Sequence, residues 1–288
     1  MKRLVQRRRS IRTVPASTSP RSSVRPGPQI HPVSSTGLGM PRVPAIRIDV
    51  ELVASLRGQA EGAELSRPLI VVVVPVLRRP HRVAPLVESF RAATTEHDAR
   101  LLFVAQASDR LEIDAIERAG LEPLVVGDGD RSWAKKINRG YEASAESWIL
   151  LGADDLRFHP GWVDSIRPLL SSHHGVIGTN DLGNVETMRG RFSTHPLVRR
   201  LYADVCGTLD ERGRITHEGY DHNFPDTERG MTARARGLYL HCTTCYIEHL
   251  HPLWGKATED EIYQLGRRNF HRDQKLFEAR TRVLHGGR

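Results

Sequence analysis

The chain has 288 residues, which is enough for one large domain or two small ones, and a formal net charge of +8. Residues 1–47 contain ten basic residues and no acid before Asp49, so subtracting ten from +8 leaves −2 for the rest. The folded part is therefore expected to be nearly neutral. No apolar core follows Arg9, which argues against a secretory signal. The longest apolar run, Leu69 to Leu77, is far too short to span a membrane.

Residues 1–44 form a basic tail that is rich in Pro, Ser, Thr and Arg and lacks apolar periodicity. Such a segment buries too little surface to offset the entropy of ordering, so it is expected to be disordered. Its composition also resembles a transit peptide. The whole chain has 37 Arg and only five Lys, however, which favours genome composition as the cause. Three cysteines make no disulfide framework and fit a reducing cytoplasm, either bacterial or that of a host.

Residues 45–66 are expected to form a short helix and a linker, and a regular pattern of strands and helices follows. The β-branched run at residues 69–76 predicts a strand buried on both faces. Helical spacing or apolar runs then predict a helix at 83–90, a strand at 101–105, a helix at 111–119, a strand at 124–126, a helix at 133–145 and a strand at 148–151. This alternation indicates βαβ units and a parallel sheet.

The strand at 148–151 ends directly in Gly152, Ala153, Asp154 and Asp155. In open α/β sheets, ligands bind beyond the carboxyl ends of the strands. Two adjacent carboxylates repel each other unless a cation lies between them, and hard oxygen ligands suit Mg2+ or Mn2+. The alternative is that these acids only cap the next helix.

The other strand ends carry polar side chains that a nucleotide could use. Arg78 and Arg79 follow the first strand, and Asp109 follows the second. The third is followed by a loop and then by a helix that bears Lys136 and Asn138. This loop contains only two of the three glycines of a dinucleotide fingerprint, and the chain has no Walker A sequence, so neither of these sites is expected. Four polar loops at one sheet edge favour a binding site.

These motifs resemble a nucleotide-sugar glycosyltransferase of the glycosyltransferase-A fold, of the family-2 type and closest to the small versions of bacteriophages and actinobacteria. The resemblance covers roughly Pro68 to Tyr263. It implies an α/β catalytic domain at 67–288, with a mostly parallel central sheet flanked by helices. Residues 67–158 would form the nucleotide-binding half, and residues 159–288 the acceptor half and a C-terminal helix. In this family an Asp-x-Asp element binds the metal and the diphosphate, and here Gly152 stands where the first Asp would be.

The resemblance implies a donor site and a metal site. The donor-binding residues would be Pro75, Arg78, Arg79, Asp109, Lys136, Asn138, Ala153 and Asp154. Mn2+ or Mg2+ would be held by Asp154, Asp155 and a histidine, either His249 or His251. These two histidines would share one face of a continuing strand. A zinc site with Cys242 and Cys245 is an alternative, but their three-residue spacing on a strand predicts opposite faces.

The segment from Tyr220 to Glu228 leads into a predicted helix that ends near Arg236. An inverting transferase needs a carboxylate to take the proton of the attacking hydroxyl. By resemblance, Asp226 is the first candidate for this base and Glu228 the second. Alternatively, both acids only complement the helix dipole. Tyr220, His222 and Trp254 are candidate acceptor contacts, although aromatic side chains are more typical of a core.

The expected function is therefore metal-dependent transfer of a hexosyl or pentosyl group from a nucleoside diphosphate sugar to a hydroxyl acceptor, with inversion. The acceptor could be a glycan, a protein or a modified DNA base. A nucleotidyltransferase would share the sheet but needs a glycine-rich loop after the first strand. The alternative from another class is a nucleic-acid-binding or virion-associated protein, because the basic tail can contact phosphate backbones non-specifically.

Overall fold

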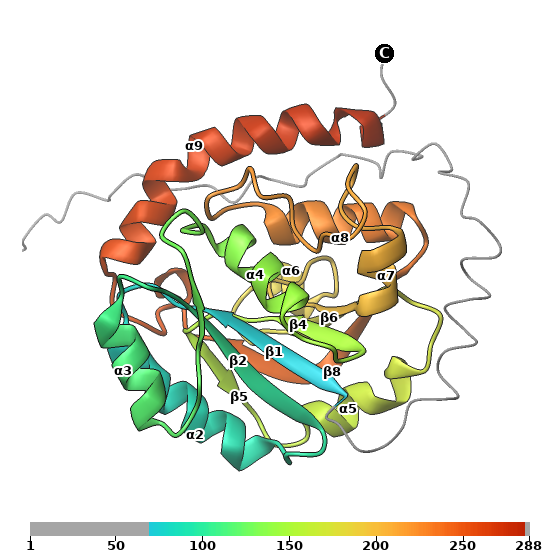
Figure 1. Cartoon of the computed structure of the whole chain (residues 1–288). Helices are drawn as coiled ribbons and strands as arrows, with labels where there is room; N and C mark the ends of the chain where they lie inside the picture. The colour runs from blue at the N-terminus through green and yellow to red at the C-terminus, as the bar shows by residue number, and fades with distance from the viewer. Residues whose placement is uncertain (1–68, 286–288) are drawn as a thin grey trace, which may run out of the picture. The chain divides into compact units, whose positions relative to one another are not determined.

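The computed structural model describes residues 69–285 (Figure 1). The tail at 1–44 and the helix expected within 45–66 lie outside these residues. None of the helices between residues 69 and 285 combines the length and the apolar character that a membrane crossing requires.

The first half of the described chain alternates strands and helices, as predicted. Its elements are β1 (Ile70–Pro75), η2 (Pro80–Arg82), α2 (Val83–Ala93), β2 (Ala99–Gln106), α3 (Arg110–Arg118), β3 (Leu124–Val126), α4 (Trp133–Glu142) and β4 (Trp148–Leu151). The bounds predicted for β3 and β4 are confirmed to the residue. Helix α4 begins where the Ser132 hydroxyl accepts a hydrogen bond of 3.2 Å from the Lys135 amide, which is a standard N-cap.

The second half contains shorter elements. They are β5 (Leu156–Phe158), α5 (Trp162–Leu170), β6 (Val176–Asn180), α6 (Val185–Met188), β7 (Leu197–Arg199), α7 (Arg200–Val205), α8 (Pro225–Ala235), β8 (Tyr239–His249), η3 (Pro252–Trp254), α9 (Glu261–Thr281) and η4 (Arg282–His285). Asp154 and Asp155 lead directly into strand β5, so the alternative in which they only cap the next helix is wrong. Helix α5 starts only after Gly161, which has a φ of +83°.

The strands form one eight-stranded sheet in the order β3-β2-β1-β4-β7-β6-β8-β5. Strands β3, β2, β1 and β4 are parallel to their neighbours in this group. Strand β7 is antiparallel to β4 and β6, and β5 is antiparallel to β8, whereas β6 and β8 are parallel. The parallel part places the ends of β1 and β4 side by side, which is the geometry expected for a ligand crevice.

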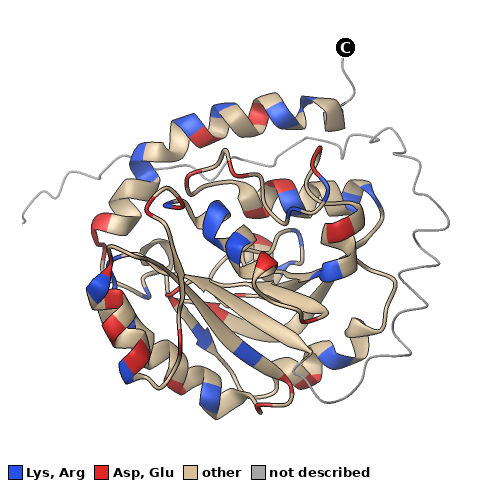
Figure 2. Ribbon diagram, viewed as in Figure 1, with Lys and Arg blue, Asp and Glu red and all other residues tan. Residues whose placement is uncertain are grey.

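Helices cover both faces of the sheet (Figure 1). Ile70, Val72 and Val74 of β1 pack in a core with residues of α2, α3 and α5, whereas Val71 and Val73 pack with residues of α4, α7 and α8. Because side chains alternate along a strand, a continuous apolar run fills both cores. Figure 2 shows the strands with few charged residues, while α3 and α9 carry charges of both signs.

The pairing of β6 with β8 contains a large irregularity. Gly178 pairs with His241 and Asn180 pairs with Tyr246, so β8 has three more residues than β6 between these pairs. Cys242 and Cys245 lie inside this bulge, and both are buried in the same core. The prediction that they lie on opposite faces is therefore wrong, because it assumed a regular strand.

Candidate active site

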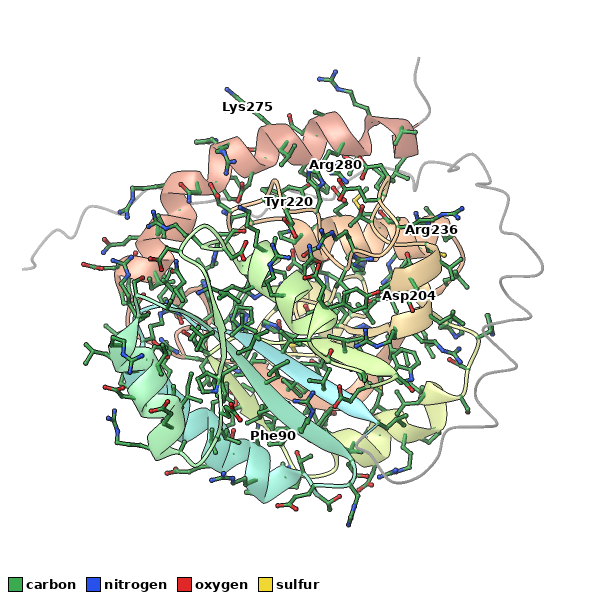
Figure 3. The ribbon with its side chains drawn as sticks, viewed as in Figure 1. Phe90, Asp204, Tyr220, Arg236, Lys275 and Arg280 are labelled. Atoms are coloured by element: carbon green, nitrogen blue, oxygen red, sulfur yellow. The ribbon has the colours of Figure 1, made fainter. Side chains whose placement is uncertain are left out.

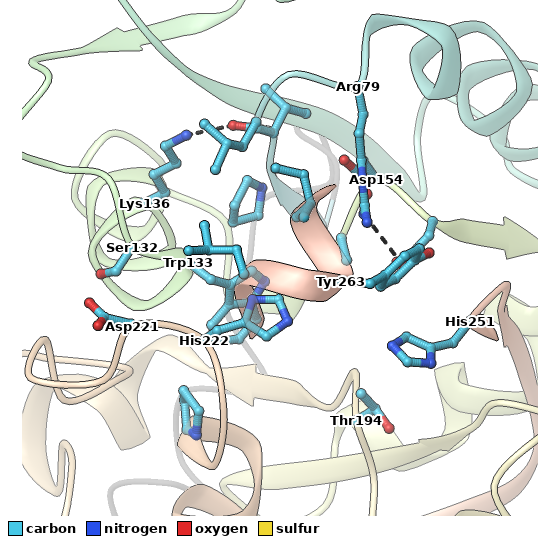
Figure 4. A pocket seen from close by; sticks show the side chains of 18 of the residues that line it. Arg79, Ser132, Trp133, Lys136, Asp154, Thr194, Asp221, His222, His251 and Tyr263 are labelled. Carbon is cyan, nitrogen blue, oxygen red and sulfur yellow. Dashed lines mark hydrogen bonds and ion pairs between the residues drawn. The ribbon is translucent and has the colours of Figure 1, made fainter. Parts of the chain in front are cut away.

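A cavity of about 440 Å³ lies beyond the carboxyl ends of β1 and β4 (Figure 4). The loop after β1, the loop before α4, the Ala153–Asp155 turn, the start of α8, the end of β8 and the first half of α9 all contribute to its wall. Of the residues selected from the sequence, ten line it: Pro75, Arg79, Lys136, Ala153, Asp154, Asp155, His222, Asp226, His249 and His251. The structure thus brings together candidates from both halves of the chain.

The carboxylates of Asp154 and Asp155 are buried just beyond the carboxyl end of β4, and both contact the Arg79 guanidinium. Arg79 Nη1 lies 3.0 Å from Asp154 Oδ1 and 3.9 Å from Asp155 Oδ2. Burial and the neighbouring Asp155 raise the pKa of Asp154 to about 7. For Asp155, burial is outweighed by the nearby His249, and its pKa is lowered. The pair therefore holds less negative charge than two free carboxylates would.

Gly152 is required at the turn that carries these acids. Its amide donates a hydrogen bond of 2.8 Å to the Val73 carbonyl. A Cβ atom at this position would lie 2.7 Å from the same carbonyl oxygen, which is closer than real contacts allow. An aspartate at the first position of an Asp-x-Asp element therefore does not fit here unless the backbone moves.

Asp155 has two further partners from distant segments. The Tyr263 hydroxyl donates a hydrogen bond of 2.8 Å to Asp155 Oδ2, and His249 Nε2 lies 3.4 Å from the same oxygen. The ring centroids of His249 and His251 are 5.0 Å apart, and both residues line the cavity. His251 Nδ1 accepts the Leu253 amide hydrogen, and of these two histidines only His249 lies within ion-pair distance of Asp155.

The donor set suits a hard divalent cation, because it offers two carboxylates and an imidazole. Asp155 Oδ1 and His195 Nε2 are buried and have no hydrogen-bond partner, so both retain a free acceptor or donor site. Within residues 69–285, however, no three His, Cys, Asp or Glu side chains converge closely enough to hold an ion as they stand. Asp154, Asp155 and His249 are the nearest to such a set, and the Arg79 guanidinium contacts both carboxylates.

Asp226 lies in the first turn of α8 and lines the cavity. Its Oδ1 accepts hydrogen bonds from the amide and the hydroxyl of Thr227, at 2.8 and 3.4 Å. Among the described residues no group bonds to Oδ2. Burial raises the pKa of Asp226 to about 6. A carboxylate with one free oxygen and a pKa close to neutrality is suited to accept a proton.

Lys136 and Arg131 supply positive charge elsewhere in the wall. Lys136 is 1 % exposed, and its ammonium donates to the Val76 carbonyl at the end of β1. Burial lowers the pKa of Lys136 to about 8, so it remains mostly charged at neutral pH. Arg131 is exposed and also lines the cavity.

Six residues selected from the sequence do not line the cavity. Asn138 is buried against the 215–218 segment, where its amide bonds to the backbone of Ile215 and Thr216. Asp109 accepts the amide hydrogen of Arg78, which has a φ of +52°, and the exposed Arg78 side chain pairs with Glu261.

The remaining three are Tyr220, Glu228 and Trp254. Glu228 is buried and accepts hydrogen bonds from the Tyr220 hydroxyl and the Arg280 guanidinium, each at 2.7 Å. Tyr220 and Arg280 lie between α8 and α9 (Figure 3), so this group joins the two helices. Trp254 packs over Gly183 instead of facing the cavity.

Several lining residues were missed in the sequence, namely Arg131, Trp133, Thr194, His195, Asp221 and Tyr263. Trp133 is the first residue of α4, and its indole NH donates to the Gly152 carbonyl at 3.0 Å. Tyr263 lies in α9, 108 residues from its partner Asp155. Nothing local distinguishes such residues from core aromatics, because their partners come from remote segments.

No protein-family model and no curated protein matches the sequence. Solved structures are nevertheless similar. A mannosyltransferase from Pyrobaculum calidifontis, in complex with GDP-Man and Mn2+, has a TM-score of 0.57 at 12% identity, over 80% of this chain and 74% of that one. Glucosyl-3-phosphoglycerate synthase from Mycobacterium tuberculosis, in complex with Mn2+, UDP and glucosyl-3-phosphoglycerate, has a TM-score of 0.50 at 13% identity, over 79% and 83%.

TarS 1–349 from S. aureus, in complex with UDP, has a TM-score of 0.50 at 11% identity and covers 62% of this chain and 59% of that one. These structural neighbours are nucleotide-sugar glycosyltransferases of the glycosyltransferase-A type. At such identities the likeness establishes the fold and not the activity. The chain therefore has the glycosyltransferase-A fold that the motifs implied.

Proposed function

We propose that the protein is a glycosyltransferase that moves a hexosyl or pentosyl group from a nucleoside diphosphate sugar to a hydroxyl acceptor. The observation that carries the proposal is that Asp226 faces the same cavity as Asp154 and Asp155. Asp226 suits proton acceptance, and the Asp154–Asp155 pair suits binding of a cation. The volume of about 440 Å³ is in the range of small-molecule sites.

In the proposed reaction, Asp226 acts as the general base. The acceptor oxygen bonds to the anomeric carbon while the bond from that carbon to the diphosphate breaks, and the hydroxyl proton passes to Asp226. Attack on the face opposite the leaving group inverts the anomeric centre. When bound at Asp154, Asp155 and His249, Mn2+ or Mg2+ would supply positive charge for the diphosphate.

The donor would lie along the loops after β1 and before α4. Pro75 and Ala153 shape this part of the wall, and Lys136 and Arg131 bring positive charge to it. Cations in a partly enclosed site attract a diphosphate more strongly than they do in open water. His222 also lines the cavity and is the candidate contact for the acceptor hydroxyl; the carbonyl of its neighbour Asp221 accepts the amide hydrogen of Trp133.

The resemblance to small bacteriophage and actinobacterial enzymes, and a cytoplasmic location in a bacterial or host cell, belong to the same proposal. It also includes the division of the catalytic domain near residue 158. What supports this division is that β1 and β4, whose ends border the cavity, precede residue 158, whereas Asp226 and His249 follow it.

A donor screen by thermal shift tests the proposal. Nucleoside diphosphate sugars should be tried with and without Mn2+, and the cognate donor should raise the melting temperature. A ligand at 100 times its Kd stabilises a protein by about 2.7 kcal/mol. Transfer should stop in EDTA and return with Mn2+. If no donor stabilises the protein, the proposal fails, whereas full turnover in EDTA would remove only the metal from it.

A further inference from the structure

Arg79 lies where the two site carboxylates converge. Its side chain is 5% exposed, and its guanidinium joins Asp154 at 3.0 Å and Asp155 at 3.9 Å. The opposite nitrogen, Nη2, bonds to Asp260 at 2.7 Å. The guanidinium carbon stacks 4.0 Å from the ring centroid of Tyr263 (Figure 4). A single side chain thus contacts both carboxylates and is held in place from the first turn of α9.

The backbone beside Arg79 is also fixed. Its amide donates a hydrogen bond of 2.7 Å to Glu112, a fully buried carboxylate of α3. The preceding residue, Arg78, has a left-handed φ of +52°, and its amide donates a hydrogen bond of 2.7 Å to Asp109. Two acids at the start of α3 therefore clamp the turn from which the Arg79 side chain extends. The guanidinium is placed by the fold and is not a loose surface charge.

A cation in this place changes how a metal can bind. Two adjacent buried carboxylates attract any positive group nearby, and the Arg79 guanidinium already compensates part of their negative charge. Asp155 Oδ1 remains buried without a partner, so the neutralisation is incomplete. A divalent ion would give Asp155 Oδ1 a partner, but the ion and the guanidinium cannot both occupy the space between the carboxylates.

We propose that Arg79 is the resident counter-ion of the Asp154–Asp155 pair and that a divalent cation binds these carboxylates in competition with its guanidinium. The inference rests on the part of the proposed function that places a metal at this pair. It does not depend on whether the protein transfers sugar. Two consequences follow: the protein alone binds Mn2+ weakly, and removing the Arg79 charge strengthens that binding.

The test is a titration of the full-length protein with Mn2+ alone, in which electron paramagnetic resonance measures the free ion. Arg79→Gln is expected to lower the Kd for Mn2+ by at least about 5-fold, the lower end of ordinary couplings between two ligands. Adding Asp154→Asn to that variant should abolish the gain, which locates the ion at the carboxylates. Melting temperatures show whether each variant is folded.

Arg82→Gln is the matched control. Arg82 lies 3.9 Å from the same Asp260 and 5.5 Å from the same Tyr263 ring, but it makes no ion pair with Asp154 or Asp155. Its removal lowers the local positive charge equally but frees neither Asp154 nor Asp155 from an ion pair, so it should strengthen Mn2+ binding much less. If Arg79→Gln does not fold, Arg79→Lys keeps the charge without the forked geometry and should show a smaller gain in the same direction.

Three results would overturn the inference: unchanged or weaker Mn2+ binding in folded Arg79→Gln, an equal gain in Arg82→Gln, or no Mn2+ binding in any folded variant. None of them decides whether the protein transfers sugar, because the titration contains no donor. The donor screen, repeated in EDTA, answers that question separately.

Discussion

The Tyr263 hydroxyl donates a hydrogen bond of 2.8 Å to Asp155 Oδ2 across 108 residues of sequence. This bond ties the first turn of α9 to the end of β4, so the long C-terminal helix is part of the candidate site. The Tyr263 ring also lies beside Arg79, so one side chain contacts both Asp155 and the guanidinium that pairs with it.

Tyr263→Phe is therefore expected to destabilise the protein while keeping the ring contact with Arg79. Hydrogen bonds to charged groups contribute about 1.5–3 kcal/mol, and the variant leaves a carboxylate oxygen with one partner fewer. The free energy of unfolding in urea measures the loss. Tyr246→Phe is the control, because Tyr246 is exposed and loss of its hydroxyl should change the free energy of unfolding little. Equal losses in both variants would show that the Asp155 bond has no special weight.

Asp226→Asn should lower the rate of transfer, whereas Glu228→Gln should lower the stability of the protein. If Asp226 is the base, its amide variant should lower transfer by about 10²–10⁴-fold with little change in donor affinity or stability. Glu228 is instead buried in an ion pair with Arg280. Breaking such a pair costs about 3–5 kcal/mol, so Glu228→Gln should lower the melting temperature and leave the rate of the folded fraction nearly unchanged.

Transfer rates and melting temperatures of both variants check this prediction. A severe rate loss in folded Glu228→Gln, together with a mild one in Asp226→Asn, would transfer the role of base to Glu228. Small rate losses in both would leave the inverting mechanism without a base in α8.

Glu112 should make stability depend on pH. Burial raises the pKa of Glu112 from 4.5 to about 7 in the folded protein. The folded state then holds this proton more tightly than the unfolded state does. The contribution of Glu112 is fully present below about pH 4.5 and is lost as the pH rises through 7. At 1.36 kcal/mol per pKa unit, the loss is at most about 3 kcal/mol.

Glu112→Gln should therefore reduce the fall in unfolding free energy between pH 5 and pH 7.5, because an amide does not titrate. Asp154 and Asp226 also have raised pKa values, so part of the fall should remain. Urea unfolding at both pH values measures the difference. Glu117→Gln, an exposed change on the same helix, should retain the wild-type fall. If Glu112→Gln retains it as well, the buried carboxyl is not its source.

Gly152 should not tolerate a side chain. An added Cβ would press on the Val73 carbonyl oxygen at 2.7 Å, and overpacking of this kind costs about 1–3 kcal/mol. Gly152→Ala should lower the free energy of unfolding by this amount, and Gly152→Asp by at least as much. Gly129→Ala is the control, since no atom lies within 4 Å of its added Cβ. A stable Gly152→Asp variant with tighter Mn2+ binding would show that the turn can adapt.

The order and type of the elements from β1 to β4 could be predicted from the sequence, because each depends on local periodicity. The valine run of β1 and the four apolar residues of β4 bury both faces of their strands. Strands β5 and β7 have three residues each and were not predicted. Strand β3 is equally short, but it could be recognised because it lies between two predicted helices in a regular alternation. The bulge around Cys242 depends on the register with β6, which no local pattern encodes.

The residue types at the sheet edge were also evident in the sequence, since polar groups after buried strands stand out. What each group contacts was decided by tertiary structure. Asn138 and Glu228 are polar and buried, but partners from remote segments direct them away from the cavity. Conversely, Tyr263 reaches Asp155 only because α9 folds back over the end of β4. A side chain's chemistry is local, whereas the partner that satisfies its charge or hydrogen bond when it is buried is supplied by the whole fold.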